Sequence, residues 1–347
     1  VLRQMDEASC DHLLDQTGSM RTLRQLHENG LFVISIGGDT YRYHRLFHDF
    51  LQSQIGQDPA QVQKMHRRAA THYRCAGHPE ETVYHLLKAK EQEQAADLIE
   101  EIGPRLVDLG RFDSLSSWIG QLPADLVAVR PSLLLLMGDL SRLRARFDEA
   151  LDNYAYAESL YRLEGEQLGR SRALSGQAQV YLDTVRPLKG DNLLQEALRL
   201  LEPEEYRQEV AALLDKLAEN KLNLGYPNEA QILHHEAGLL RTETEPGDVF
   251  LDARAMVRTG KLADAQRLLE MRADDEQRAD HSRPQRFHRE THLLLSLVHV
   301  MQGNQEAADR HARKGISVGR ELGSAFVEAV GYMRLGHALQ LRDNRPW

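Results

Sequence analysis

The sequence predicts an all-α protein of stacked helix pairs, preceded by a small domain that contains one β-hairpin. Three observations predict this class. The chain is rich in helix-forming residues and poor in aromatic ones, which make up 6% of its 347 residues. A single β-branched patch stands near the N-terminus. A short motif then recurs, at intervals that are mostly near 34 residues, along the rest of the chain.

The N-terminal segment predicts helices followed by a two-stranded wing. Residues 31–36 are apolar, residues 37–40 (Gly-Gly-Asp-Thr) signal a turn, and residues 41–43 can pair back across it. We expect one helix over 21–29 and another over 44–55. This order is typical of a winged-helix domain. Because a Gly-Gln-Asp-Pro segment follows, we place the domain boundary after residue 58.

The recurring motif has a small residue at a turn, then an acidic residue or Asn, and then Ala. Gly or Ala leaves the first helix without steric conflict, the anion favours the start of the second helix, and Ala permits close approach. A gap of 80 residues (145 to 225) fits two repeats, with a degenerate copy over Gly190–Ala197. The clear copies begin at Gly77, Gly110, Ala145, Gly225, Gly260 and Gly303.

The spacing predicts a tetratricopeptide-like right-handed superhelix over residues 59–347, with a concave groove for a ligand. We expect the array to continue past residue 347, and we expect surface loops over 242–248 and 272–286. Within the helix predicted over 208–224, one face carries a stripe broken only by a lysine: Val210, Leu214, Leu217, Lys221 and Leu224.

Composition limits the classes of function. A net charge of −9 without a segregated basic patch opposes direct nucleic-acid binding by these residues. The two cysteines, Cys10 and Cys75, are too few to crosslink the fold, and the apolar runs are too short for a membrane span. We therefore expect a cytoplasmic protein without membrane contact. Because the chain begins at Val1 rather than at Met, we interpret it as part of a longer protein.

Several short sequence segments resemble those of a known family. They are the segments 10–18 (Cys-Asp-His-Leu-Leu-Asp-Gln-Thr-Gly), 41–51, 66–70, Leu122-Pro123 and 130–133 (Arg-Pro-Ser-Leu). Together they resemble MalT-type regulators, which are STAND-class ATPases with a LuxR-type DNA-binding domain at the C-terminus. The resemblance implies a parent protein with a P-loop ATPase domain, a winged helix, an effector-binding superhelix and then the DNA-binding domain.

The resemblance also implies partners and cofactors. The superhelix would bind a small-molecule inducer or a regulatory protein, the winged helix would contact the parent's own ATPase domain, and the activated parent would oligomerise. The parent would be a slow switch-type ATPase that binds ATP and ADP. It would bind DNA only through its C-terminal domain. This chain holds no Gly-x-x-x-x-Gly-Lys-Ser/Thr motif, so we expect no cofactor and no enzymatic activity from it alone.

His44 is the candidate nucleotide sensor. In related STAND switches a Met-His-Asp motif places its histidine on the phosphate of bound ADP, and the resemblance gives His44 this role in the parent. Tyr43 and Arg45 depart from that motif. The alternative is that His44 only packs on the wing.

Tyrosines in the central repeats are candidate ligand contacts. Tyr154, Tyr161 and Tyr181, with Tyr156 nearby, could hold a polar effector such as a sugar, and the alternative is that they pack in the core. The pairs His44/His48 and His288/His292 have the spacing of zinc ligands but lack a third ligand, so we predict no metal site. We also find no catalytic arrangement.

The leading hypothesis is therefore the effector-sensing segment of an ATP-dependent transcription activator. The alternative hypothesis is a tetratricopeptide adaptor that binds a peptide or partner protein and has no transcriptional role. Residues 1–58 discriminate between the two, because an adaptor needs no winged helix.

Overall fold

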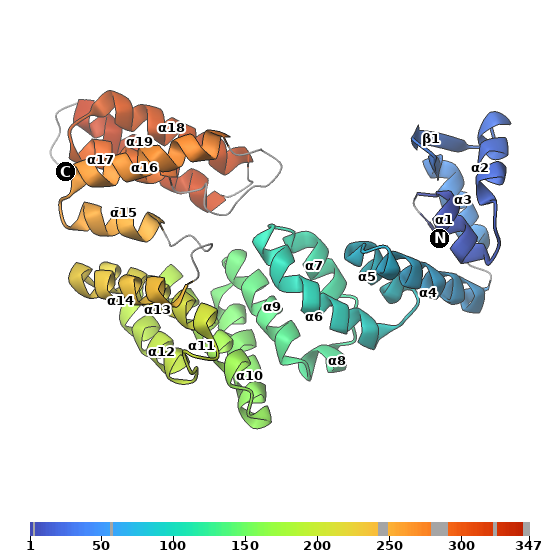
Figure 1. Ribbon diagram of the computed structural model, residues 1–347, viewed down its shortest axis with the longest axis horizontal. Coiled ribbons are helices and arrows are strands. Elements are labelled where there is room, and N and C mark those ends of the chain that lie inside the picture. Colours follow the sequence, from blue (N-terminus) through green and yellow to red (C-terminus); the bar gives the residue numbers. More distant parts are fainter. Residues whose placement is uncertain (3, 56–57, 242–248, 279–290, 322–324, 343–347) are drawn as a thin grey trace. The chain divides into compact units, whose positions relative to one another are not determined.

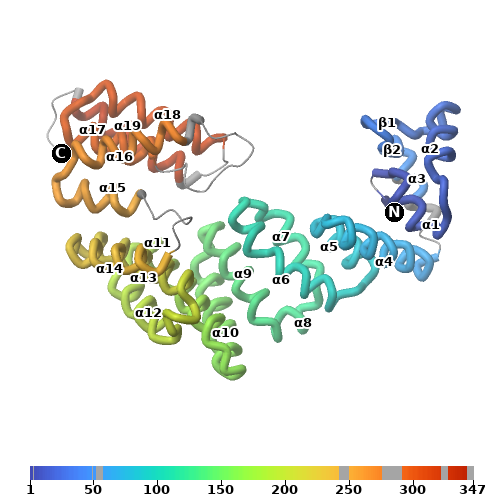
Figure 2. Tube along the Cα trace, in the orientation of Figure 1, coloured from blue at the N-terminus to red at the C-terminus, as the bar shows by residue number. Residues whose placement is uncertain are grey.

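The computed structural model describes residues 1–347 except 3, 56–57, 242–248, 279–290, 322–324 and 343–347. The chain divides into two compact units, Val1–Leu140 and Ser141–Trp347, and each unit is considered by itself. Figure 1 labels the elements of both units, and Figure 2 traces how the chain reverses direction between successive helices within each of them. Beyond residue 60 each element of the described residues is a helix, as predicted.

The predicted wing is confirmed. The wing is formed by β1 (Val33–Gly37) and β2 (Thr40–Tyr43). The helices of the same domain are α1 (Glu7–Leu14), α2 (Ser19–Glu28) and α3 (Arg45–Ile55). The two strands pair antiparallel, with Val33 opposite Tyr43 and Ser35 opposite Tyr41. Met5 adds an isolated bridge, because its backbone exchanges two hydrogen bonds with Tyr41.

The winged-helix core reaches into the first repeat helix. Buried Leu13, Leu23, Val33 and Tyr41 form this core together with Ala69 of α4 (Pro59–Cys75), and Met65 and Tyr73 of α4 pack against it. Helix α4 also pairs with α5 (Pro79–Lys88), so it is shared by the winged helix and the repeats. The first unit continues with α6 (Gln92–Asp108), α7 (Phe112–Ile119), α8 (Ala124–Ala128) and the start of α9 (Pro131–Leu143).

The second unit is built from long antiparallel helices in contact with their neighbours along the chain. They are α10 (Phe147–Glu164), α11 (Gln167–Asp183), α12 (Pro187–Arg199), α13 (Arg207–Leu224), α14 (Pro227–Leu240), α15 (Val249–Arg258), α16 (Leu262–Arg278), α17 (Thr291–Met301), α18 (Gln305–Glu321) and α19 (Ala325–Arg342). The predicted loop over 272–286 is partly wrong, because residues 272–278 extend α16. Residues 279–286, and the loop predicted over 242–248, lie outside the described residues.

The turns of the repeated motif lie where the sequence places them. The small residue of each clear copy ends its helix pair's first helix with a positive φ, between 58° and 87°. A side chain with a Cβ rarely adopts this backbone conformation, which explains why five of the six copies use Gly.

The degenerate copy lies five residues earlier than the sequence suggested. Its turn is at Val185, which has φ 57°, and α12 begins at Pro187, so residues 190–197 are helical. Gly190 takes the place of the motif's alanine, and a methyl group there would lie 2.9 Å from a methyl carbon of Leu182. The prediction missed this turn because a β-branched residue occupies a position where glycine was expected.

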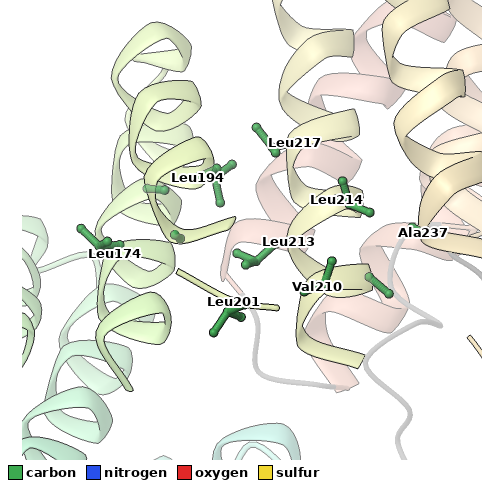
Figure 3. Close-up of a cluster of buried hydrophobic side chains, with 11 residues drawn as sticks. Leu174, Leu194, Leu201, Val210, Leu213, Leu214, Leu217 and Ala237 are labelled. Carbon is green, nitrogen blue, oxygen red and sulfur yellow. The ribbon is translucent and has the colours of Figure 1, made fainter. Parts of the chain in front are cut away.

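One core cluster of the second unit lies between α11, α12, α13 and α14. Leu174, Leu194, Leu213 and Leu217 are among its buried members, and Figure 3 shows them on neighbouring helices. The predicted stripe is buried at Val210, Leu214 and Leu217. Its exception, Lys221, pairs with Asp191 at 3.3 Å, so the charge is compensated where the stripe is broken.

Ion pairs join the first helix of one repeat to the first helix of the next. Arg142 contacts Asp183 at 2.9 Å, and Arg254 contacts Glu219 at 2.6 Å. These pairs are partly exposed, so each contributes little to stability. Among the helices of the described residues, none combines the length and the apolar character that crossing a membrane requires.

Candidate functional site: an apolar face around His44

The hairpin and α3 expose apolar side chains on one small domain. Leu46 is 75% exposed, Phe32 58% and Phe50 55%, and Ile34 and Ile36 of β1 are exposed as well. Isolated exposed apolar residues are normal on a protein surface, but a group of them marks an interaction site. The winged-helix domain therefore carries a candidate interaction surface.

Aromatic stacking holds this face together. The ring of Phe47 lies between Phe32, at 4.9 Å between centroids, and Phe50, at 6.2 Å, while Tyr43 meets Phe47 edge-on at 5.6 Å. Phe32 adopts φ 57°, a conformation that costs an L-residue about 1–2 kcal/mol. Bulky residues occupy this region only where the surrounding structure imposes it, so the backbone at Phe32 is held by its neighbours.

His44 lies at the border of this face, directly before α3. Its backbone N–H donates to the carbonyl of Phe32 at 2.7 Å, and its own carbonyl accepts from the N–H of His48 at 3.0 Å. The backbone is thus fixed on both sides, while the residue remains exposed. This placement suits a side chain that contacts a ligand or a neighbouring domain. The nucleotide-sensor role stays a prediction.

The apolar face was not predicted, although the sequence contains a signal for it. Leu46, Phe47 and Phe50 follow one another on a short helix, which is more apolar surface than the winged-helix core uses. The signal could be read only with the knowledge of which face packs inward.

Two of the three predicted tyrosines are buried in the interior of the second unit. Tyr154 is 1% exposed, and its ring lies over Gly176 of α11, where an added methyl group would come within 2.7 Å of the ring carbons Cδ1 and Cζ. Tyr161 is buried against Gly169 in the same way. Both rings fill space between α10 and α11, which favours the core-packing alternative over contact with a ligand.

Tyr181 differs, because it lies at the end of α11 and is only partly buried. The ammonium of Lys189 lies 5.2 Å from the centroid of its ring, the geometry of a cation–π contact. The structure thus separates Tyr181 from the buried Tyr154 and Tyr161, and its role in ligand binding stays a prediction.

Hollows occur on the described surface of the first unit. One of about 530 Å³ lies between α4, α5 and α6 and includes Arg74, His78 and Asp97, and one of about 580 Å³ lies beside α2 and includes Arg24 and Asp39. Both linings mix positive and negative side chains, and the predicted site residues lie outside them.

For metal binding, the parts of the chain that the structure describes contain no group of three or more His, Cys, Asp or Glu side chains that could hold an ion. His288 lies outside the described residues, and His292 instead contacts His311, with 3.1 Å between their Nδ1 atoms.

Comparison with known proteins agrees with this geometry. Residues 1–63 match the family model of the MalT winged helix domain. The chain is 26% identical over 220 residues to the HTH-type transcriptional regulator MalT of Vibrio campbellii, covering 61% of this chain and 24% of that protein. The MalT regulator of Vibrio cholerae is 27% identical over the same length and coverage. The chain thus spans about a quarter of the length of these relatives.

Among solved structures, the crystal structure of the APC/C hetero-tetramer Cut9–Hcn1 is similar, with a TM-score of 0.54 and 14% identity over 87% of this chain and 57% of that one. At this identity the likeness concerns the fold alone, and it supports the helical-repeat class predicted from the motif spacing.

Proposed function

Residues 1–63 are a winged-helix domain of the MalT type, and we propose from this premise that the chain is the regulatory segment of an ATP-dependent transcription activator. In this proposal the repeats bind an inducer or a regulatory protein, and the winged helix reports that binding to an ATPase domain of the same protein. DNA would be bound by a further domain, and the protein would act in the cytoplasm.

One observation carries the proposal: the winged helix exposes an apolar face with His44 at its border. A domain whose only role was to support the repeats would not need the exposed Leu46 and Phe50. An ATPase domain packed on this face would cover the apolar side chains and bring its bound nucleotide to His44. A plain adaptor would gain nothing from this arrangement, which is why we favour the regulator.

The switch itself follows from differential affinity. In the resting state ADP would be held between the ATPase domain and the imidazole of His44, which can donate a hydrogen bond to a phosphate. Inducer bound to the repeats would favour a conformation in which the winged helix has left that position. Nucleotide exchange, oligomerisation and DNA binding would then follow as a shift of population between two states.

Replacement of His44 in the full-length regulator tests the sensor. Loss of one charge-assisted hydrogen bond to phosphate is worth about 1.5–3 kcal/mol. This corresponds to about 10- to 150-fold weaker ADP binding for His44→Ala. Transcription without inducer should rise accordingly. The matched control is His78→Ala, because His78 is also an exposed histidine directly before a helix, α5.

The apolar face is tested separately from the histidine. Leu46→Ser should leave the fold intact, because the side chain is 75% exposed, yet raise inducer-free transcription by weakening the contact with the ATPase domain. Leu163→Ser on α10, where the side chain is 83% exposed, is the control for loss of a surface leucine. If Leu46→Ser and His44→Ala both behave like their controls, the winged helix does not contact the nucleotide domain and the proposal is wrong.

A further inference from the structure

Two pairs of histidines face one another across helix pairs. The Nδ1 atoms of His66 on α4 and His85 on α5 are 2.8 Å apart, and both residues are buried. The Nδ1 atoms of His292 on α17 and His311 on α18 are 3.1 Å apart. At such a contact one Nδ1 donates a hydrogen and the other accepts it, so two fully protonated rings cannot form it.

The two pairs occupy equivalent positions in their repeats. In each, the first histidine stands eleven residues before the turn glycine and the second stands eight residues after it, counted from Gly77 and Gly303. The same offsets from the turns at Val185 and Gly225 give the pairs Leu174/Leu193 and Leu214/Leu233, which belong to or pack against the hydrophobic core of the second unit. Two repeats thus carry a titratable contact where others carry an apolar one.

The surroundings of the first pair disfavour an added charge. Tyr73 of α4 stacks on His85 at 5.3 Å with the rings nearly parallel, and Tyr84 of α5 meets both histidines edge-on. Burial, together with the positive charge of Lys88, lowers the pKa of His66 to about 4. Tyr73 also packs against the winged-helix core, so this pair adjoins that domain.

The second pair is part of a group of three rings. His299 follows His292 by seven residues on α17, and its ring stacks on that of His311 with 5.4 Å between centroids. Burial lowers the pKa of His292 and His299 and lowers that of His311 to about 4. Lys314 faces His292, Arg310 faces His299 and His311, and the acidic Glu270 of α16 faces His299.

We propose that the two pairs are acid-sensitive latches, which hold α4 to α5 and α17 to α18 while their rings are neutral and release them on acidification. The first proton taken up places a buried cation beside Lys88 or Lys314, and a second sets two N–H groups against each other. The repeats that carry Leu174/Leu193 and Leu214/Leu233 have no group at these positions that can titrate, so they lack this latch. Because Tyr73 joins His85 to the winged-helix core, release of the first latch also loosens the support of that domain.

The sign and size of the effect follow from linkage. A histidine whose pKa in the folded state lies below the 6.5 of the free side chain takes up its proton more readily when its helix pair opens, so stability is lost as pH falls below 6.5. With a folded pKa of about 4, each such ring raises the opening equilibrium constant about 30-fold between pH 7.5 and pH 5.0.

Hydrogen exchange followed by mass spectrometry tests this on the whole chain. Amide rates at pH 7.5 and pH 5.0, each divided by the intrinsic rate at that pH, give opening constants for every helix pair. We expect peptides of α4–α5 and α17–α18 to open about 30-fold more at pH 5.0, whereas peptides of α11–α12 change little. An equal rise in all helix pairs, or none in the two with histidines, would overturn the proposal.

Double variants that replace each histidine pair with leucines reproduce the leucine pairs that other repeats carry at the same positions. His66→Leu with His85→Leu should abolish the acid response of α4–α5 and leave that of α17–α18. His292→Leu with His311→Leu should reduce the response of α17–α18 to the part that His299 retains, and it should leave that of α4–α5. If a leucine pair prevents folding, the single variants His66→Gln and His311→Gln retain hydrogen-bonding capacity without titrating near pH 6. His235→Gln, at an exposed position on α14, is the control and should change neither response. An acid response in a substituted pair that is as large as in the unmodified chain contradicts the latch.

Discussion

Gly176→Ala tests whether Tyr154 belongs to the core or is available to a ligand. In an α-helix, alanine in place of glycine ordinarily stabilises by about 1 kcal/mol. At Gly176 the new methyl carbon would lie 2.7 Å from two carbons of the Tyr154 ring, against the roughly 3.5–4.0 Å of a relaxed carbon contact. The ring is 1% exposed and has little room to retreat.

Overpacking of this kind costs about 1–3 kcal/mol, which outweighs the gain in helix propensity. We therefore expect Gly176→Ala to lower the free energy of unfolding by about 1 kcal/mol. The matched control is Gly336→Ala on α19, where an added methyl group meets nothing within 4 Å, so that this variant should be stabilised. Urea denaturation monitored by circular dichroism, with both variants measured beside the unmodified chain, gives the difference.

A combination of substitutions isolates the contact. In a Tyr154→Leu background the clash should be relieved, so the effect of Gly176→Ala should move toward that of the control. If Gly176→Ala instead stabilises the chain as much as Gly336→Ala does, the ring of Tyr154 does not lie over Gly176. Tyr154 would then be free to leave the interface of α10 and α11, and its role as a ligand contact would regain support.

Two further predictions follow from the turns and the cysteines. Val185→Gly should stabilise the chain by about 1 kcal/mol, because Val185 holds φ 57° while its side chain is 84% exposed, and Gly225→Val should destabilise it by at least as much. Urea midpoints that move in the opposite direction would show that the turn at Val185 is misplaced. Burial, aided by the charge of Asp6, raises the pKa of the Cys10 thiol to about 11, whereas Cys75 is exposed. A thiol reagent at pH 8 should therefore modify Cys75 alone in the native chain and both cysteines in urea, and rapid native labelling of Cys10 would contradict its burial.

The sequence by itself determined the local architecture. The turns at Gly77, Gly110, Gly225, Gly260 and Gly303 could be predicted because a positive φ restricts the choice of residue to glycine and few others. The hairpin could be predicted in the same way, from a glycine pair between two β-branched and aromatic segments. At Val185 a β-branched residue adopts the positive φ in place of glycine, and there the predicted turn was displaced by five residues.

Only the tertiary structure decided which side of each helix is covered. Helical periodicity states which residues share a face, but not which neighbour packs on it, so Tyr154 and Tyr161 could be taken for surface residues until Gly176 and Gly169 were placed under their rings. The same limit applies to residues far apart in the chain. His66 and His85 are separated by 19 positions, and their hydrogen bond exists only because two antiparallel helices bring equivalent positions together. Exposure of Leu46 likewise depends on how many faces of α3 the winged-helix core uses, which is a property of packing rather than of sequence pattern.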